Sequence, residues 1–293
     1  MLRGNDMYIK DIFKEKNNVL SLEVFPPKKS SDLAPIIETV TELSKNPIDY
    51  MSVTYGAGGT TAAYTAEIAD HLENNLNITA LSHLTCVNTT KESIREILNT
   101  LKCKGIENIL ALRGDLPEGM NAENFTFPHA SDLAKEIKDF GGFCVGGACY
   151  PECHPDSSSI DNDLENLKIK IDSGVDFLVT QMFFDNNAFY NFRDKALKKG
   201  ITVPITAGIM PLTNINQIKK MCILSGGAAM PNKFTRMIAK FSDNPAALKQ
   251  AGIAYAVDQI TDLLSNDTQG IHIYTMNKPD IAQKITNVIN EMF

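Results

Sequence analysis

Apolar and polar positions alternate in blocks along this chain. Eight short apolar runs recur, and a segment of helix length follows each of them. Runs that stay apolar without strict alternation are typical of parallel strands buried on both faces. The runs cover residues 19–27, 50–59, 78–86, 108–117, 143–154, 177–185, 203–211 and 271–278. Strand and helix therefore alternate in the α/β manner, and the pattern predicts a (β/α)8 TIM barrel.

The segments between the runs have helical spacing, with apolar residues three and four positions apart. Ser or Thr precedes several of them and Gly or Asn follows, as expected of helix caps. These segments are 32–45, 61–74, 91–105, 130–142, 161–174, 186–200 and 214–226. The connection 227–269 is unusually long and carries further helical runs, so we expect an extra helical insertion before the last strand. Residues 1–293 then form a single barrel catalytic domain.

Polar residues stand at the ends of nearly all these apolar runs. In a (β/α)8 barrel the loops after the strands build the active site. The strand-end residues are Glu23, Thr54, His83, Asp115, His154, Gln181 and Asn277. We expect all of them to face one mouth.

Composition narrows the function. A net charge of -7 and a pI near 5.3 argue against a nucleic-acid or anionic-membrane surface, because either needs a basic patch. The start of the chain lacks the apolar core of a signal peptide, and no stretch reaches the roughly 20 apolar residues that span a bilayer. We therefore expect a cytoplasmic protein without nucleic-acid or membrane partners, and an exposed apolar helix face favours a homo-oligomer. Cys149, Cys153 and His154 lack the C-x-x-C pairing of zinc sites, so no metal is expected.

Glu23 is the first candidate catalytic residue. It interrupts the apolar run L-E-V-F and precedes Pro26 and Pro27. Burial there would raise the pKa of the carboxyl group and suit it to protonate a substrate nitrogen or oxygen. The alternative is a structural carboxylate paired with a neighbouring lysine or arginine.

The triplet Arg113-Gly114-Asp115 ends the fourth run. Glycine allows a flat ligand to approach the backbone, and the flanking charges are placed to recognise it. A purely structural Arg-Asp turn would look the same. Because Glu23 is expected at the same rim, the two acids can differ in protonation and take different roles.

The glycine-rich stretch 56–61 matches neither the Rossmann nor the P-loop pattern, so any dinucleotide must be held by barrel loops. Candidates are His154 with Asp163, Asn166 and Lys170, whose spacing places the last three on one helical face. A solvated helix surface gives the same spacing. His83, in an apolar run, is more often a core residue than a catalyst. Gln181 and Gln217 can read the amide-like edge of a heterocycle, but mean little alone.

Several motifs together resemble one enzyme family. The stretches S-L-E-V-F-P-P-K, S-V-T-Y-G-A, H-L-T-C, A-L-R-G-D-L-P, Y-P-E-C-H-P, Q-M-F-F-D and Y-T-M-N are similar, in this order, to those of the methylenetetrahydrofolate reductases. The resemblance covers about residues 19–290 and matches the compact bacterial form. It implies an FAD-containing barrel that uses NADH or NADPH to reduce 5,10-methylenetetrahydrofolate to 5-methyltetrahydrofolate, in one-carbon metabolism and methionine synthesis.

The resemblance also implies roles for individual residues. Glu23 would be the general acid that protonates N10 of the folate and opens the ring to an N5 iminium, which then takes hydride from the reduced flavin. Asp115 would contact the pterin edge, influence the flavin potential and stabilise the cationic iminium. Gln181 and Gln217 would bind folate, and Thr54 and Gln181 would meet the nicotinamide nucleotide. Both substrates would share one flavin face, which gives ping-pong kinetics.

The positions implied for FAD contact are Tyr55, Ala57, His83, Arg113, Gly114, Asp115, Ala130, Tyr150, His154, Ser157, Asp163, Asn166, Ile169 and Lys170. Three substitutions depart from the family pattern. Ile169 stands where an arginine would help to hold the FAD phosphates, and Met221 where an aromatic ring would stack on nicotinamide or folate. Lys278 replaces an arginine near the folate tail, keeping the charge but losing the planar fork.

Two alternatives remain at this point. One is a flavin-free pterin-binding barrel that transfers or carries methyl groups, and the other is a non-catalytic ligand-binding barrel. The choice between NADH and NADPH is also open, because the sequence contains no recognisable loop for reading the ribose.

Overall fold

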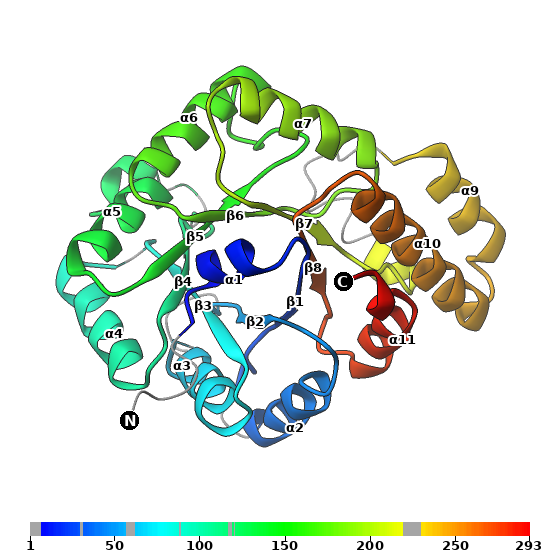
Figure 1. Ribbon diagram of the computed structural model, residues 1–293, viewed down its shortest axis with the longest axis horizontal. Helices are drawn as coiled ribbons and strands as arrows, with labels where there is room; N and C mark the ends of the chain where they lie inside the picture. Colours follow the sequence, from blue (N-terminus) through cyan, green and yellow to red (C-terminus); the bar gives the residue numbers. More distant parts are fainter. Residues whose placement is uncertain are drawn as a thin grey trace.

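The computed structural model describes residues 7–29, 32–56, 62–87, 89–116, 119, 121–218 and 230–293. Eight parallel strands close into a barrel in sequence order, ringed by helices (Figure 1). The strands are β1 (Val19–Val24), β2 (Tyr50–Val53), β3 (Thr79–Thr85), β4 (Asn108–Leu112), β5 (Cys144–Cys149), β6 (Phe177–Thr180), β7 (Ile205–Ile209) and β8 (Gly270–Tyr274). The predicted (β/α)8 barrel is confirmed, with each strand inside the apolar run that predicted it, apart from Gly270, one residue before the last run.

The helices follow the predicted segments closely. They are α2 (Leu33–Leu43), α3 (Ala62–Asp70) with its π-helical continuation η2 (His71–Asn75), α4 (Lys91–Cys103), α5 (Ala130–Phe140), α6 (Ile160–Asp172) and α7 (Asn186–Lys198). Most of the predicted helix 214–226 lies outside the described residues. In the part that the structure describes, residues 215–218 are helical. The insertion before β8 contains α9 (Asn232–Phe241) and α10 (Pro245–Ser265), and α11 (Pro279–Ile289) ends the barrel.

Local sequence explains where several of these helices begin. Thr90 Oγ1 accepts a hydrogen bond from the Ser93 backbone N–H, and Ser93 Oγ accepts one from the Thr90 backbone N–H, which forms a capping box for α4. Ser159 caps α6 and Asp185 caps α7 through the same kind of bond to orphan backbone N–H groups. These caps fix the points at which the loops after β3, β5 and β6 enter their helices.

The described residues form three apolar clusters, and two of them contain most of the buried apolar residues of the strands. The larger one lies between the strands and the surrounding helices and includes the outward residues of β1, such as Leu22 and Val24. The smaller one lies inside the barrel and joins Tyr50 and Phe177 to Ile9 and Ile12 of helix α1 (Ile9–Glu15). Inward and outward positions therefore alternate along each strand, as the strand period of two requires.

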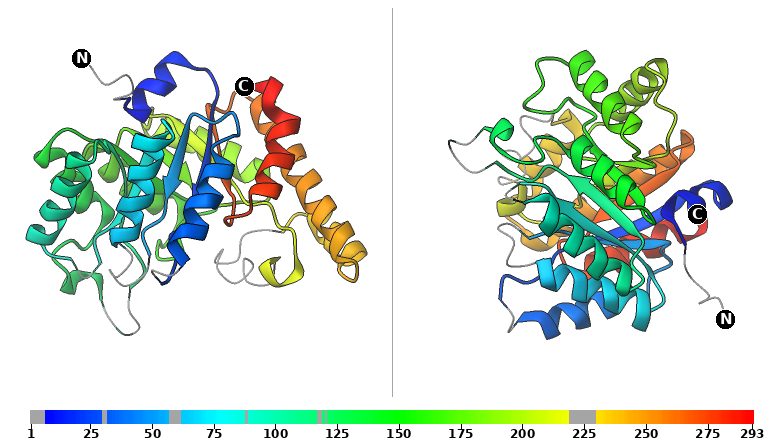
Figure 2. Two further views of the ribbon diagram at one scale, coloured as in Figure 1. Left: turned by 90° about the horizontal axis from the view of Figure 1, so that it is seen from below. Right: turned by 90° about the vertical axis from the view of Figure 1, so that its left-hand side faces the viewer.

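Helix α1 was not anticipated from the sequence. It lies across the centre of the barrel in Figure 1, and Figure 2 places it at the same end as the C-terminus. Asn108 Oδ1 accepts a hydrogen bond from the Ile9 backbone N–H at 2.8 Å, which ties the helix to the start of β4. Because α1 closes the N-terminal end of the strands, a ligand must enter from the C-terminal end.

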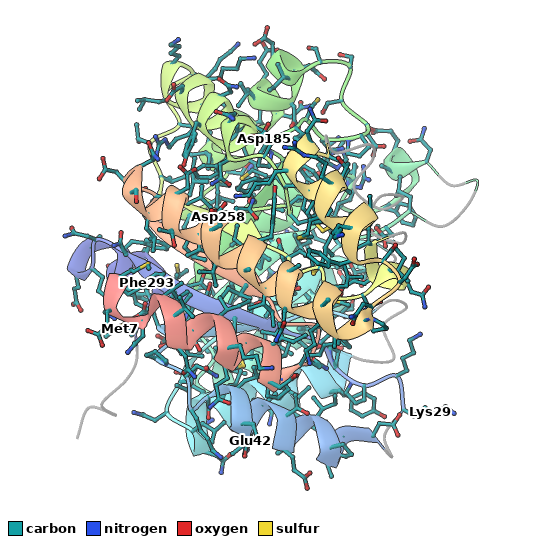
Figure 3. All side chains as sticks on the ribbon, turned by 90° about the vertical axis from the view of Figure 1, so that its right-hand side faces the viewer. Met7, Lys29, Glu42, Asp185, Asp258 and Phe293 are labelled. Carbon is teal, nitrogen blue, oxygen red and sulfur yellow. The ribbon has the colours of Figure 1, made fainter. Side chains whose placement is uncertain are left out.

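The insertion packs on one side of the barrel. Helix α10 contacts both α9 and α11 along its length, with Asp258 on its outer surface (Figure 3). In the same view Met7 and Phe293 lie at the closed end, and Lys29, which follows β1, lies at the opposite end. In the part of the chain that the structure describes, no helix combines the length and the apolar character needed to cross a membrane.

Candidate active site at the barrel mouth

Glu23 lies near the C-terminal end of β1, with its carboxylate inside the barrel. Its Oε2 is 3.4 Å from His272 Nε2 and 3.5 Å from His83 Nε2, and Ser52 Oγ donates to it at 3.4 Å. Only 17% of the side chain is exposed. Among the described residues no lysine or arginine forms an ion pair with Glu23, so the purely structural alternative is not supported. The carboxylate is held by imidazoles and a hydroxyl instead.

The pKa of Glu23 differs in direction from the sequence-based expectation. Burial does raise the pKa, but the hydrogen bond with His272 and the electrostatic effects of the two imidazoles, His83 and His272, outweigh it, so the net shift is downward. Burial lowers the pKa of His83 to about 4, so this imidazole is neutral near pH 7. The expectation of a raised pKa considered burial alone and missed the two histidines that β3 and β8 bring to the same oxygen.

The loop after β8 fixes the end of β1. Thr275 Oγ1 donates to the Glu23 carbonyl oxygen at 2.6 Å. The Asn277 side-chain amide accepts from the Phe25 N–H at 3.0 Å and donates to the Phe25 carbonyl at 2.9 Å. Asn277 itself has a left-handed backbone, with φ of 52°. Both ends of its amide are therefore engaged in positioning the strand that carries Glu23, which gives this strand-end residue a structural task.

A cavity of about 350 Å³ opens beside the ends of β4 and β5. Nine of the residues predicted to contact FAD line it together: Arg113, Ala130, Tyr150, His154, Ser157, Asp163, Asn166, Ile169 and Lys170. They come from four separate parts of the chain, between β4 and α6. Their convergence on one cavity is the arrangement that an elongated, partly anionic ligand requires.

Hydrogen bonds within the wall of this cavity hold it in shape. Asp163 accepts from the His154 backbone N–H at 3.0 Å and from Ser157 Oγ at 3.2 Å. Lys170 Nζ donates to the Ala148 carbonyl at 2.7 Å, and burial lowers the pKa of this lysine. Asp163 therefore organises the loop after β5, while Lys170 supplies a buried amine to the cavity.

The triplet Arg113-Gly114-Asp115 lies where β4 ends. Gly114 has a φ of 87°, and a Cβ there would stand 3.1 Å from the Thr85 side chain, so glycine is required by the backbone. Arg113 donates to Asp156 at 2.9 Å across the cavity wall. Asp115, the acid of the same triplet, is exposed, and the partner of Arg113 is Asp156.

Electrostatic effects relate Asp115 to Glu23. Burial chiefly raises the pKa of Tyr274, and the charge of Glu23 and the nearby Tyr150 raise it further. The pKa of Tyr150 is raised by burial and, among smaller effects, by Asp115. The pKa of Tyr274 is therefore sensitive to Glu23, and the pKa of Tyr150 is sensitive to Asp115.

The remaining predicted residues are less closely grouped. Tyr55 and His83 line a separate cavity of about 310 Å³ beside β2 and β3. Thr54 follows β2, and its carbonyl accepts from Thr65 Oγ1. Lys278 is half-buried and immediately precedes α11. Ala57 and Met221 lie outside the described residues, so the structure says nothing of these two predictions.

The side-chain amides of Gln181 and Gln217 differ in how free they are to bind a ligand. Gln181 Oε1 accepts from the adjacent Met182 N–H at 3.0 Å, and no hydrogen bond of its NH₂ group occurs among the described residues. The Gln217 amide accepts from the backbone of Thr213 and donates to the carbonyl of Pro211 at 3.2 Å. With 9% of its surface exposed, Gln217 needs to exchange these bonds before it can bind a substrate.

Several residues of the site were not found from the sequence. His272 and Ser52 contact Glu23, and His129, Ser131 and Asp156 line the larger cavity. A signal did exist for His272, because it stands two positions before Tyr274 in an apolar strand and so points inward with it. Asp156 and Ser131 had no such signal, because they lie in a loop and in the first turn of a helix.

The fold and the buried acid define the class of the molecule: a (β/α)8-barrel enzyme with its site at the C-terminal ends of the strands. The family model described as methylenetetrahydrofolate reductase matches residues 8–290. The chain belongs to the methylenetetrahydrofolate reductase family and is an oxidoreductase.

Curated relatives agree with this family assignment, and a solved structure agrees with the fold. The chain is 33% identical to the 5,10-methylenetetrahydrofolate reductase of Pectobacterium carotovorum, over 92% of this chain and 89% of the relative. It is 34% identical to methylenetetrahydrofolate reductase (NADH) 1 of Arabidopsis thaliana, over 92% of this chain but 48% of that longer protein. An uncharacterised Clostridium thermocellum protein that binds 5-methyl-5,6,7,8-tetrahydrofolic acid has a TM-score of 0.65 at 14% identity, covering 98% and 100% of the two chains. At that identity it shows the fold alone.

Proposed function

We propose that this protein reduces 5,10-methylenetetrahydrofolate to 5-methyltetrahydrofolate, with FAD as cofactor and NADH or NADPH as hydride donor. The observation that carries the proposal is the buried carboxylate of Glu23 in a barrel whose cavity beside β4 and β5 is lined by nine expected cofactor contacts. Curated relatives named as NADH-dependent reductases favour NADH.

The chemistry of the cavity fits a flavin dinucleotide. Arg113, Lys170 and the N-terminal end of α5 at Ala130 supply positive charge and N–H donors for phosphate groups. Asn166 and Ser157 supply uncharged groups for ribose hydroxyls. FAD, when bound, would accept hydride from the nicotinamide nucleotide and pass it to the folate carbon.

Glu23 acts as the acid of the folate step. Its proton goes to N10 of the folate as the bond between N10 and the methylene carbon breaks. Thr275 and Asn277 hold the backbone at the end of the strand that carries Glu23, and the imidazole of His272 and the hydroxyl of Ser52 hold its carboxyl group. Asp115, at the same mouth, stabilises the positive charge that develops on the pterin.

Gln181 is the better placed of the two glutamines for folate binding. Its carbonyl oxygen is already engaged with the Met182 backbone, so its NH₂ group is oriented by that bond. Gln217 would join only after leaving its bonds to the loop after β7. Lys278 would hold the carboxylates of the folate tail by charge.

An anaerobic two-step experiment tests the proposal. Protein purified with FAD should show a flavin absorption spectrum that NADH bleaches, and 5,10-methylenetetrahydrofolate should then restore it. Recovery after the NAD+ formed in the first step has been removed would support ping-pong exchange through one flavin face. A colourless protein that binds 5-methyltetrahydrofolate but takes up no FAD would favour the flavin-free carrier barrel and refute this function.

A further inference from the structure

A buried histidine stands directly behind Glu23. His272 is 1% exposed, and its Nε2 faces Glu23 Oε2 at 3.4 Å while its Nδ1 lies 2.8 Å from Ser21 Oγ. One face of the ring stacks on Tyr50 at a centroid distance of 6.5 Å, and Tyr274 packs edge-on at 5.1 Å. Both nitrogens and both sides of the ring are therefore fixed.

Packing alone does not explain a histidine at this position. Branched apolar side chains usually fill the interior of such barrels, and burying an imidazole costs free energy unless its nitrogens are bonded. Each nitrogen of His272 faces an oxygen, so the ring can hold one proton or two. An imidazole whose second nitrogen is oriented by a hydroxyl has the geometry of a proton donor to the first partner.

His83 approaches the same carboxylate oxygen but is differently placed. Its Nε2 has no hydrogen-bond partner in the described part of the chain, although it lies 3.5 Å from Glu23 Oε2. Burial lowers its pKa to about 4, so it carries no transferable proton near neutral pH. Within the described residues, His272 is the one of these two histidines whose second nitrogen has a hydrogen-bond partner, Ser21 Oγ, that would orient the ring.

We propose that His272 is a positioning residue that stores the proton which Glu23 delivers to the folate. This inference rests on the function proposed above. In each turnover the Nε2–H bond of His272 breaks as Oε2–H forms on Glu23, and that bond breaks in turn as N10–H forms. The electron pair of the broken bond between carbon and N10 stays on N10. FAD, when bound in the cavity beside β4 and β5, would supply the hydride of the nicotinamide nucleotide for the new C–H bond.

The proton is replaced from water at the mouth once the product leaves, through the part of Glu23 that remains exposed. The overall step therefore consumes one reduced nicotinamide nucleotide and one proton for each folate. Among the described residues, the titratable groups that face His272 are Glu23 from β1, Tyr50 from β2, His83 from β3 and Tyr274 from β8 itself. Burial raises the pKa of Tyr50 to about 12 and raises that of Tyr274 well above its ordinary value, so Glu23 is the anion among them at neutral pH.

The pH profile of the folate half-reaction in His272→Asn distinguishes two roles for the ring. If His272 stores the proton, the wild-type rate falls at high pH only when the pair loses that proton. The variant then depends on Glu23 alone, so its alkaline limb shifts to lower pH, and its rate near pH 8 falls by about tenfold or more. If His272 only holds Glu23 ionised, its removal raises the pKa of the carboxyl group, and the limb shifts to higher pH.

A downward shift of the limb supports the proposal, and an upward shift or an unmoved limb overturns it. The rate is expressed relative to NADH oxidation with menadione in the same preparation, so that loss of flavin cannot imitate the effect. His71→Asn, on η2 away from the mouth, is the matched control. Should His272→Asn fail to fold, Ser21→Ala replaces it, and the same shift in smaller measure is expected.

A second measurement is independent of turnover. The imidazole carbon signals of the five histidines can be assigned by comparison with His272→Asn and followed through a pH titration. Glu23→Gln removes the carboxylate that faces Nε2 of His272, so the pH dependence of the His272 signals should change. Signals that follow pH as in the wild type refute proton sharing. A changed pH dependence in a protein that reduces no folate would instead show that the proposed function, and not the proton pair, is wrong.

Discussion

The neutral state of His83 has a measurable consequence for stability. Its pKa falls from 6.5 to about 4 on folding, mainly because 94% of the residue is removed from solvent. The unfolded chain therefore takes up a proton below about pH 6.5, while the folded protein does so only near pH 4. The contribution of His83 to the free energy of unfolding is therefore fully present above pH 6.5, and it is lost as the pH falls toward 4. At about 1.4 kcal/mol per pH unit, the loss amounts to about 3 kcal/mol.

Urea denaturation at about pH 7 and about pH 4.5 measures this loss. His83→Gln removes the titrating group, so its free energy of unfolding should fall less between the two pH values than that of the wild type, by roughly 2–3 kcal/mol. His71→Gln is the control and should follow the wild type. If wild type and His83→Gln lose stability in parallel, His83 is not held neutral, and the contrast drawn between the two histidines at Glu23 is incorrect.

Two further substitutions test the packing of the barrel beside Tyr274 and the binding of FAD phosphates beside α6. Gly208→Ala would place a Cβ 2.4 Å from the Thr180 carbonyl and 2.8 Å from Tyr274, so the melting temperature should fall by an amount equivalent to about 1–3 kcal/mol. Gly147→Ala, whose nearest neighbours are side-chain atoms at 3.1 Å or more, should cost less, and equal losses would contradict the packing argument. Ile169→Arg should tighten FAD binding by about tenfold in a titration, because one charge-assisted hydrogen bond to a phosphate is worth about 1.5 kcal/mol. Ile169 is 57% exposed, and Leu197→Arg, at a residue 63% exposed on α7, should leave FAD affinity unchanged. Equal affinity in Ile169→Arg and wild type would place the phosphates elsewhere.

The sequence was sufficient to predict the barrel because its strands are buried on both faces. A continuous apolar run such as 177–185, with helical segments on both sides of it in the chain, is typical of a parallel strand that has neither face in solvent. Helix α1 escaped prediction because it is a single short amphipathic element whose role, closing the barrel, depends on contacts with Asn108 and the inner core. Such long-range contacts leave no local pattern in the sequence.

The site was predicted in part. Motif resemblance brought together the residues of the larger cavity, since they follow β4 and β5 in fixed order. The direction of the Glu23 pKa shift was wrong, because the two imidazoles that reverse the effect of burial come from strands far away in the chain. Gln217 illustrates the same limit: its residue type suits folate binding, but its bonds to Pro211 and Thr213 are properties of the folded loop.

The central claim is that the acid Glu23 and a bound flavin serve one folate at one mouth, in separate half-reactions. Anaerobic stopped-flow absorbance on Glu23→Gln tests it most directly. We predict that NADH still bleaches the flavin at close to the wild-type rate, while reoxidation by 5,10-methylenetetrahydrofolate falls by about a hundredfold or more. Reoxidation at the wild-type rate would contradict the assignment of Glu23 as the proton donor.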